Sequence, residues 1–328
     1  MINSRRFLPL AVCAAAFFLV ASPALAQETT GGIQGLVEVR SDKSPLPGVS
    51  VEAIHVPTGT RYAAVTGASG QFNILNVRVG GPYTVTAKIS GFRTETFKDI
   101  MVALGERRYV TFDLDVAAVT ENVSVTAEAE PLISPSRMGS EQAISNAEIT
   151  ALPTLNRQFQ DFARVNPYVN VQAGDSSQTA ISVAGRNNRY NSIQIDGAVN
   201  NDLFGLAATG TPGGQTNTQP ISLVTIQEIQ VAVSPYDIKQ SGFTGGAINM
   251  VTRSGTNDFH GSVYGSTRNE NYIGDKVPQA YGDALDKPYA TFKQDQYGAR
   301  VGGPILKDQL FFFASGERNK LTQPTGTS

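Results

Sequence analysis

Histidine and cysteine, the residues of catalytic triads and of thiolate or imidazole metal sites, are scarce in this sequence. The 328 residues include two histidines, His55 and His260, and one cysteine, Cys13. Neither histidine has a second ligand three or four residues away, and no G-x-S-x-G, Walker A, H-E-x-x-H or paired C-x-x-C motif occurs. Asp196 and Asp202 could form a carboxylate pair, but we expect both to accept hydrogen bonds in turns. The sequence therefore predicts no enzyme, no metal site and no cofactor.

Composition narrows the function classes further. Charged residues make up only 16% of the chain and the formal net charge is −2, whereas an average soluble protein has about 25% charged residues. There is no run of Lys and Arg, so nucleic acid is not an expected partner. The chain contains 32 Gly and 17 Pro but no Trp. This is not the composition of a helical bundle or of a disordered acidic tail.

The N-terminus has the three parts of a secretory signal peptide. Arg5 and Arg6 precede an apolar stretch, residues 7–21, and the stretch is followed by Ala24-Leu25-Ala26. A membrane anchor is the alternative, but this stretch is shorter than the ~20 residues that a spanning helix needs. We expect residues 1–26 to be removed before Gln27, and we expect no lipid on Cys13 because the bulky Val12 precedes it.

From residue 27 to 117, short segments alternate apolar and polar residues and end at Gly, Pro, Asp or Ser. Apolar residues two positions apart share one face of a strand. The clearest examples are Val49, Val51 and Ala53; Tyr83, Val85, Ala87 and Ile89; and Val110, Phe112 and Leu114. About seven strands fit this segment, so we predict an Ig-like β-sandwich.

The same segment resembles the carboxypeptidase regulatory-like, or transthyretin-like, domain family. The resemblance rests on Pro47-Gly48-Val49, Thr66 with Gly70 and Phe72, Tyr83 with Val85, and Gly91-Phe92. It implies a β-sandwich without catalytic activity. Two roles stay open for it, a structural spacer and a carbohydrate-binding domain.

Residues 118–139 have the composition of an extended linker with one strand-like segment near its start. That segment is Glu121, Asn122, Val123, Ser124, Val125, Thr126 and Ala127. It belongs to no obvious sheet, so its backbone could pair with a partner strand, although it could also be the last strand of the sandwich. It resembles the TonB box of outer-membrane receptors, which implies that it binds TonB.

Residues 140–253 mix helical and strand patterns, which predicts a compact α+β module. Ser145 and Glu148 form a capping box, residues 159–163 have helical spacing, and Asp196-Gly197 ends a short strand. Five motifs follow one another: Leu152-Pro153 with Arg157, Phe159 and Asp161; Val183 with Gly185-Arg186; Ile195-Asp196-Gly197; Ile226 with Glu228-Ile229; and Gly245-Gly246 with Ile248, Asn249, Val251 and Thr252. They stand in the order found in the plug domain of TonB-dependent receptors, and this module resembles that domain. The plug-motif residues that we single out are Gly185, Arg186, Asp196, Gly197, Gly245 and Gly246.

Four polar and aromatic residues follow the second of these motifs directly. They are Asn187, Asn188, Arg189 and Tyr190. We expect them to form a loop near a ligand, with packing against a barrel wall as the alternative.

The last segment, residues 254–328, resembles the opening of the barrel in the Oar-like branch of these receptors. Strands are expected at about 259–268, 295–305 and 309–318, with a tight turn at Lys307-Asp308. Phe311 and Phe313 suit the aromatic girdle of an outer-membrane barrel, whereas a soluble hairpin is the alternative. A plugged barrel needs about 22 strands. The chain is therefore expected to be a fragment, with an incomplete transmembrane β-barrel.

These resemblances together imply the N-terminal part of an Oar-like TonB-dependent outer-membrane receptor for a siderophore, saccharide, peptide or similar small ligand. They imply TonB with its inner-membrane energising complex and outer-membrane lipid as partners, and a Gram-negative outer membrane as the location, with the N-terminal domain in the periplasm. The alternative is a soluble periplasmic or surface protein that binds glycans.

Overall fold

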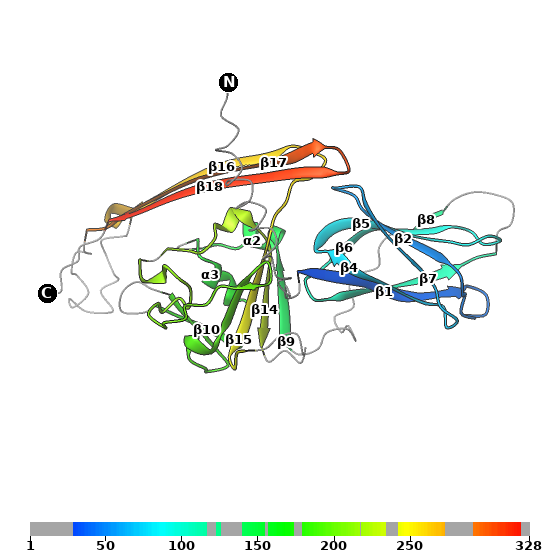
Figure 1. Cartoon of the computed structure of the whole chain (residues 1–328), viewed down its shortest axis with the longest axis horizontal. Coiled ribbons are helices and arrows are strands. Elements are labelled where there is room, and N and C mark those ends of the chain that lie inside the picture. Colours follow the sequence, from blue (N-terminus) through cyan, green and yellow to red (C-terminus); the bar gives the residue numbers. More distant parts are fainter. Residues whose placement is uncertain are drawn as a thin grey trace, which may run out of the picture.

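The computed structural model describes residues 29–116, 123–125, 140–154, 157–173, 179–216, 218–233, 242–272 and 291–322. Strands dominate these residues, and they form three groups of sheets that follow one another along the chain (Figure 1). The predicted signal peptide lies outside the described residues. No helix in the described part of the chain is long and apolar enough to cross a membrane.

The first group consists of two sheets that enclose one apolar core. Its strands are β1 (Thr30–Val39), β2 (Ser50–His55), β3 (Thr60–Val65), β4 (Gln71–Arg78), β5 (Gly80–Lys88), β6 (Glu95–Val102), β7 (Arg107–Leu114) and β8 (Val123–Val125). One sheet has the order β4-β1-β7, and the other has the order β3-β2-β5-β6-β8. The inward positions expected from the alternation are buried in this core: Val49, Val51, Ala53, Tyr83, Val85, Ala87, Val110, Phe112 and Leu114. Ile89 packs against the core and is partly buried.

Glycine at position 35 allows the central strand β1 to approach its neighbours closely. β1 pairs antiparallel with β4 and parallel with β7, so that Gly35 lies opposite Phe72 on one side and Val110 on the other. A Cβ atom at Gly35 would overlap the carbonyl oxygen of Val110 and would lie 2.8 Å from Cε1 of Phe72. Position 35 therefore requires a residue without a side chain.

The second group combines a five-stranded sheet with a hairpin and short helices. Its elements, with η for 3-10 turns, are β9 (Ser140–Ser145), α2 (Asn146–Ala151), α3 (Phe159–Ala163), β10 (Val169–Ala173), β11 (Thr179–Val183), η2 (Asn188–Tyr190), β12 (Ser192–Ile195), β13 (Ala198–Val199), η3 (Gly214–Thr216), η4 (Leu223–Thr225), β14 (Ile226–Val233) and β15 (Gly246–Thr252). The sheet order is β13-β12-β15-β14-β9.

Local signals in the sequence explain the short helices and turns of this group. The predicted capping box is present, since the backbone N–H of Ser145 donates to Oε2 of Glu148 over 2.7 Å and the N–H of Glu148 donates to Oγ of Ser145 over 3.4 Å. The predicted Asp-Gly turn follows β12, with positive φ at both residues. The apolar residues of α3 pack with β14 and β15 into one core.

The third group is a three-stranded antiparallel sheet with the order β16-β17-β18 (Figure 1). Its elements are β16 (His260–Asn269), η5 (Glu270–Tyr272), β17 (Lys293–Leu306) and β18 (Leu310–Thr322). These strands match the three expected from the sequence to within a few residues, and Asp308 in the predicted tight turn has a φ of 62°.

The two faces of this third sheet differ in chemistry. Residues paired across neighbouring strands share a face. Two rows of one face contain Ser262, Arg300 and Ser315, and Tyr264, Gly298 and Glu317. The matching rows of the other face contain Gly261, Val301 and Ala314, and Val263, Ala299 and Gly316. We call these the polar face and the apolar face.

The register corrects the expectation for the aromatic residues of β18. Phe313 pairs with Gly302 and Phe311 pairs with Pro304, which puts both on the side of the polar face. Phe312, between them, lies on the apolar face, where its ring centroid is 6.2 Å from that of Phe259. Three consecutive aromatic residues give no alternation, so only the pairing with β17 decides which of them face outward.

Candidate functional site

The segment expected to be a TonB box is paired with another strand of this chain. Glu121, Asn122, Thr126 and Ala127 lie outside the described residues, whereas Val123, Ser124 and Val125 form β8. β8 runs parallel to β6, with Val123 opposite Glu95, Ser124 opposite Thr96 and Val125 opposite Phe97. Residues 123–125 thus match the alternative interpretation of the segment, a last strand of the sandwich. The partner strand lies far back in the sequence, so alternation within the segment could not reveal the pairing.

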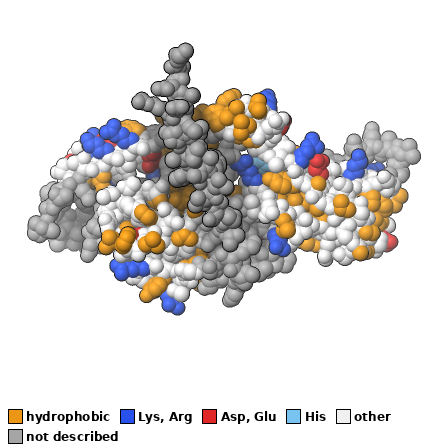
Figure 2. All heavy atoms as spheres, in the orientation of Figure 1, with side chains coloured by type: hydrophobic (Ala, Val, Ile, Leu, Met, Phe, Trp, Pro, Cys, Tyr) orange, Lys and Arg blue, Asp and Glu red, His pale blue; other side chains and the backbone are white. Residues whose placement is uncertain are grey.

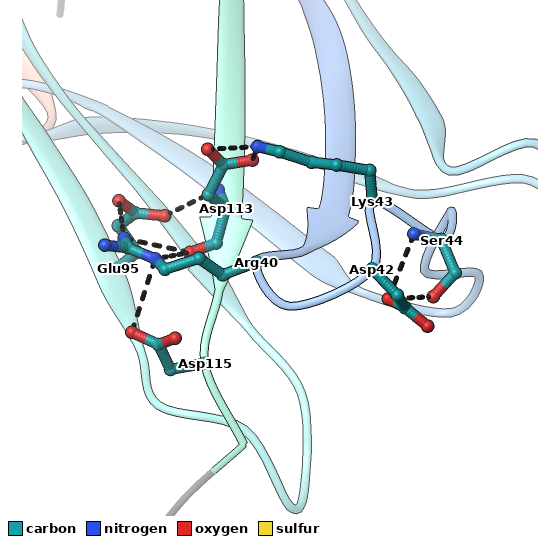
Figure 3. A network of polar contacts seen from close by, with 7 residues as sticks. All are labelled: Arg40, Asp42, Lys43, Ser44, Glu95, Asp113 and Asp115. Carbon is teal, nitrogen blue, oxygen red and sulfur yellow. Dashed lines mark hydrogen bonds and ion pairs between the residues drawn. The ribbon is translucent and has the colours of Figure 1, made fainter.

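Charged residues link the start of β6 to the opposite sheet (Figure 3). Oε2 of Glu95 accepts from the backbone N–H of Asp113 over 2.9 Å, and Oε1 lies 3.6 Å from Nη2 of Arg40. Arg40 also pairs with Asp115 at 3.3 Å, and Lys43 pairs with Asp113 at 2.7 Å. Burial raises the pKa of Glu95, while the Asp113 N–H and Arg40 act in the opposite direction. Glu95, the residue opposite Val123, is therefore held by Asp113 of β7 and by Arg40, which follows β1.

Two of the plug motifs meet in space. Oδ1 of Asn191 accepts from the N–H of Gly246 over 3.0 Å, and the carbonyl oxygen of Tyr190 accepts from the N–H of Gly245 over 2.9 Å. A Cβ atom at Gly246 would lie 2.7 Å from both Cγ atoms of Val183. The glycine pair thus allows β15 to contact the end of β11 and the turn that follows it.

The other plug-motif residues form turns at the ends of the same strands. Gly185 has a φ of 75° in the turn after β11, and the exposed Arg186 closes that turn with its N–H donating to the carbonyl of Val183 over 2.9 Å. The Asp196 carboxylate accepts from both the N–H and the hydroxyl of Thr252 over 2.8 Å, and Gly197 completes its turn with a φ of 77°. Asp196 therefore lies in the expected turn, but its carboxylate binds the end of β15 rather than a group within that turn.

Three of the four residues expected to form a ligand loop also make contacts within the loop region. Oδ1 of Asn187 accepts from the N–H of Arg189 over 3.1 Å. Asn188 Nδ2 donates to the carbonyl of Ala208 over 2.6 Å, and Nη2 of Arg189 donates to the carbonyl of Gly205 over 2.8 Å. The side chain of Tyr190 is 55% exposed. These bonds join η2 to the loop of residues 202–211.

Sequence reasoning missed the exposed apolar tip of that second loop. Leu203, Phe204 and Leu206 are 89%, 85% and 66% exposed. The Asp202 carboxylate accepts from the N–H groups of Ala207 over 2.6 Å and Phe204 over 3.1 Å, and these bonds lower its pKa. Apolar residues shortly before the glycine-rich stretch of residues 210–214 were the available signal. The turn around Asp202 presents them to solvent.

The polar face of the third sheet contacts η4 of the second group. The hydroxyl of Ser222 donates to Oε2 of Glu317, and the hydroxyls of Thr225 and Ser315 are 3.0 Å apart. Nη1 of Arg300 donates to the carbonyl of Val224 over 3.4 Å. Arg157, two residues before α3, places its guanidinium 4.5 Å from the ring centroid of Tyr264. One face of the sheet thus binds a folded module through polar groups.

The apolar face is exposed to solvent in this chain. Val263 is 86% exposed and Phe259 is 70% exposed. Along β17, the distance from Tyr297 to Gly303, which lies beside Phe259, is about 20 Å at ~3.3 Å per residue. This length is close to the ~25 Å height of the apolar band of outer-membrane barrels. Figure 2 shows hydrophobic side chains gathered at the end of the sheet where β17 turns into β18. Aromatic residues at both ends of the band match the girdles of such barrels.

The two histidines and the possible metal-binding side chains can be located in the described part of the chain. Within the described ranges, no group of three or more His, Cys, Asp or Glu side chains is placed to hold a metal ion. His55 ends β2 and His260 begins β16, as strand residues.

Two family models match this chain. Residues 32–115 match the carboxypeptidase regulatory-like domain, and residues 251–328 match an outer membrane beta barrel domain. The first match covers β1 to β7, and the second covers the whole third sheet. Both resemblances inferred from the sequence are confirmed by these matches.

Relatives connect the two matches. The chain is homologous to TonB-dependent transporters: it is 27% identical over 322 residues, 92% of its length, to the TonB-dependent transporter Oar of Myxococcus xanthus, and covers 28% of that protein. It is 28% identical over 189 residues to the probable TonB-dependent siderophore receptor PirA of Acinetobacter baumannii, covering 54% of this chain and 22% of the relative. The chain thus spans about a quarter of the length of these relatives.

Among solved structures, the crystal structure of PirA from Acinetobacter baumannii aligns with 55% of this chain and 24% of its own chain, at 21% identity and a TM-score of 0.41. The homologues are transporters and receptors, and the barrel match indicates the outer membrane of a Gram-negative bacterium.

Proposed function

We propose that this chain forms the N-terminal part of a TonB-dependent outer-membrane receptor that takes up a small ligand such as a siderophore, saccharide or peptide. The observation that carries the proposal is the two-sided third sheet. Its polar face binds η4 through Ser222, Val224 and Thr225, while its apolar face has the height of a lipid-facing band. A folded module on the inner side of a membrane sheet is the arrangement of a plugged barrel.

In this proposal the sequence divides into five parts. Residues 1–26 are the signal peptide, 27–117 an Ig-like sandwich in the periplasm, 118–139 the linker with the TonB box, 140–253 the plug, and 254–328 the first barrel strands. The chain itself has no catalytic role. The match to the carboxypeptidase regulatory-like domain and the contacts of residues 222–225 with the barrel sheet support this division.

β8 is the element that we assign to TonB. It is an edge strand of its sheet among the described residues, and the pairing of Val123–Val125 with β6 supports the proposal that this stretch can pair as an extended strand. A strand of TonB would add to its outer edge or replace β6, with main-chain hydrogen bonds supplying most of the affinity. Neither mode needs a particular side chain, which fits the simple sequence of the segment.

The ligand would bind on the side of the plug that carries the loops of residues 187–190 and 202–211. Tyr190 and the three exposed apolar residues of the second loop supply aromatic and aliphatic contact surface there, and Arg189 supplies a cation. Pulling on β8 would then act on a module whose two exposed loops are joined by the hydrogen bonds of Asn188 and Arg189. Such regions open at low free-energy cost.

Proline substitution in β8 tests the proposal. Val123→Pro and Val125→Pro each remove an N–H donor and fix φ, so either change should weaken strand addition. In the complete receptor we expect ligand binding to persist and uptake to fall at least tenfold in one or both variants. Val123→Ile and Val125→Ile are matched controls, because both keep the N–H groups and strand propensity. Uptake at the wild-type rate in both proline variants would refute the assignment.

Membrane fractionation separates this proposal from the glycan-binding alternative. The receptor should remain in the outer-membrane fraction after washing with high salt. Release by salt would favour the soluble protein instead.

A further inference from the structure

The turn between β6 and β7 inserts one leucine into the second group of sheets. Leu104 is 1% exposed and packs with Val79 of the first group and Val251 of β15. This is a small apolar contact between two parts of the chain that have separate cores.

Both backbone polar groups of Leu104 bind side chains of β14. Its N–H donates to Oε1 of Glu228 over 2.6 Å, and its carbonyl oxygen accepts from Nε2 of Gln230 over 3.0 Å. Glu228 and Gln230 are two residues apart, so they project from the same face of the strand. Each is only 5% exposed. We refer to these bonds, with the apolar packing, as the Leu104 contact.

The surroundings of Glu228 disfavour its charged form. Burial is the main cause and raises its pKa to about 7, against which the Leu104 N–H acts in the opposite direction. Glu106 in the inserted turn and Glu148 in α2 add to the rise by charge repulsion. Glu141 of β9 also lies close, since Gln230 Nε2 reaches its Oε2 over 3.4 Å. The charged groups that shift the pKa of Glu228, among the described residues, are the carboxylates of Glu106 and Glu148.

We propose that the Leu104 contact is a reversible attachment between the N-terminal domain and the plug, and that it loosens when Glu228 becomes charged. Separating the two parts exposes the Glu228 carboxyl to water, where its pKa returns toward 4.5. Attachment is then strongest below that pH and weakens as the pH rises from 4.5 to about 7. Porins contain water-filled channels, so the periplasm follows the pH of the medium and this contact can respond to it.

This inference does not depend on the role of β8 or on TonB. It requires that residues 79 and 103–106 separate from β14 and β15, and that the 2.8 Å hydrogen bond from the N–H of Asn257 to the carbonyl of Pro57 breaks with them. If the uptake experiment failed, the attachment could still be tested, and the reverse also holds.

Spin labels on the two parts give a direct measurement. The only native cysteine is Cys13, in the predicted signal peptide, so Val65→Cys and Tyr168→Cys supply a unique label pair on exposed positions. Double electron–electron resonance spectroscopy of the labelled chain in detergent should give one narrow distance distribution at pH 5. At pH 8 we expect a broad, longer component, with the attached-to-separated ratio at least about tenfold lower.

Two variants identify the cause. Glu228→Gln keeps the shape and an acceptor oxygen but cannot ionise, so its distribution should stay the same at both pH values. Gln230→Ala removes the hydrogen bond to the Leu104 carbonyl but leaves the titratable Glu228 in place. It should therefore increase the separated fraction at both pH values and keep the pH dependence. A wild-type distribution that does not change between pH 5 and pH 8, or a Glu228→Gln variant that changes as the wild type does, would overturn the proposal.

Discussion

His55 shows what burial does to a titratable side chain outside any catalytic arrangement. The residue is 4% exposed, its ring centroid lies 4.8 Å from that of Tyr83, and its Nδ1 is 2.6 Å from Oγ1 of Thr58. Burial, with a smaller effect from the charge of Arg78, lowers the pKa of His55 to about 4. A neutral imidazole in a core contributes packing and one hydrogen bond. His55 therefore has a structural role in the sandwich.

This burial predicts a loss of stability in acid. The unfolded chain binds a proton at His55 near pH 6.5, whereas the folded chain binds it near pH 4. The free energy of unfolding of the first group should therefore fall as the pH drops from 6.5 to 4, by on the order of 2–3 kcal/mol. Urea unfolding of the chain at several pH values measures this change.

The second histidine provides the matched control for that experiment. His260 is exposed at the start of β16. His55→Gln should flatten the acid dependence, although it also lowers stability at pH 7, and His260→Gln should leave it unchanged. An acid dependence that is equal in His55→Gln and in the wild type would show that His55 is not its source.

Among the elements, strand register decides features that composition leaves open. β1 lies between an antiparallel and a parallel neighbour, and both approach it at Gly35. β8 reaches a sheet edge next to the buried Glu95, and Phe312 faces outward because of its pairing with Gly303. For Gly35 and β8 a strand distant in sequence decides the pairing, and for Phe312 the register of the β17–β18 hairpin decides it.

Gly35→Ala should destabilise the first group more than any exposed glycine does. The added methyl group would overlap the Val110 carbonyl, so β7 or β1 must move and break ladder hydrogen bonds. We expect the free energy of unfolding to fall by about 3 kcal/mol or more. Gly67→Ala is the control, because its nearest neighbour would be the Gln71 carbonyl at 3.9 Å. Thermal unfolding followed by circular dichroism compares the two, and equal melting temperatures would contradict the close approach.

For the whole molecule, the central question is which surface of the third sheet meets lipid. The apolar face has no partner element among the described residues, whereas the polar face meets η4. Residue types alone would have placed Phe311 and Phe313 outward. The alternation of the three paired strands reverses that assignment and leaves small and aliphatic residues in the middle of the band.

A charge in that band should prevent stable membrane insertion of the complete receptor. Val263→Arg lies near the middle of the apolar face and should cost about 2–4 kcal/mol there. Ser266→Arg is the matched control, since Ser266 pairs with Gln296 on the polar face of the same sheet. We expect Val263→Arg to lower the heat-modifiable fraction in outer membranes, and Ser266→Arg to leave it near the wild-type level. The opposite order would mean that the faces are reversed.

The sequence by itself determined many of the elements and the resemblance to known domain families. Period-2 alternation placed the buried residues of β2, β5 and β7, the Ser145–Glu148 capping box placed α2, and the Asp196-Gly197 turn ended β12, because each of these signals is local. The motifs also indicated the domains that the family models match. None of these signals depends on contacts between segments that are distant in the sequence.

Tertiary structure alone decided the pairing of β8 with β6, the outward position of Phe312 and the burial of Glu228 against Leu104. The first and the third depend on segments far apart in the chain, and the second depends on the register of the β17–β18 hairpin. Backbone groups take part in all three, and backbone groups are the same in every residue. A carboxylate on a strand looks exposed in the sequence, and only the insertion of the 103–106 turn removes it from water. The contacts with the most specific consequences for this protein are therefore long-range ones, which no local pattern encodes.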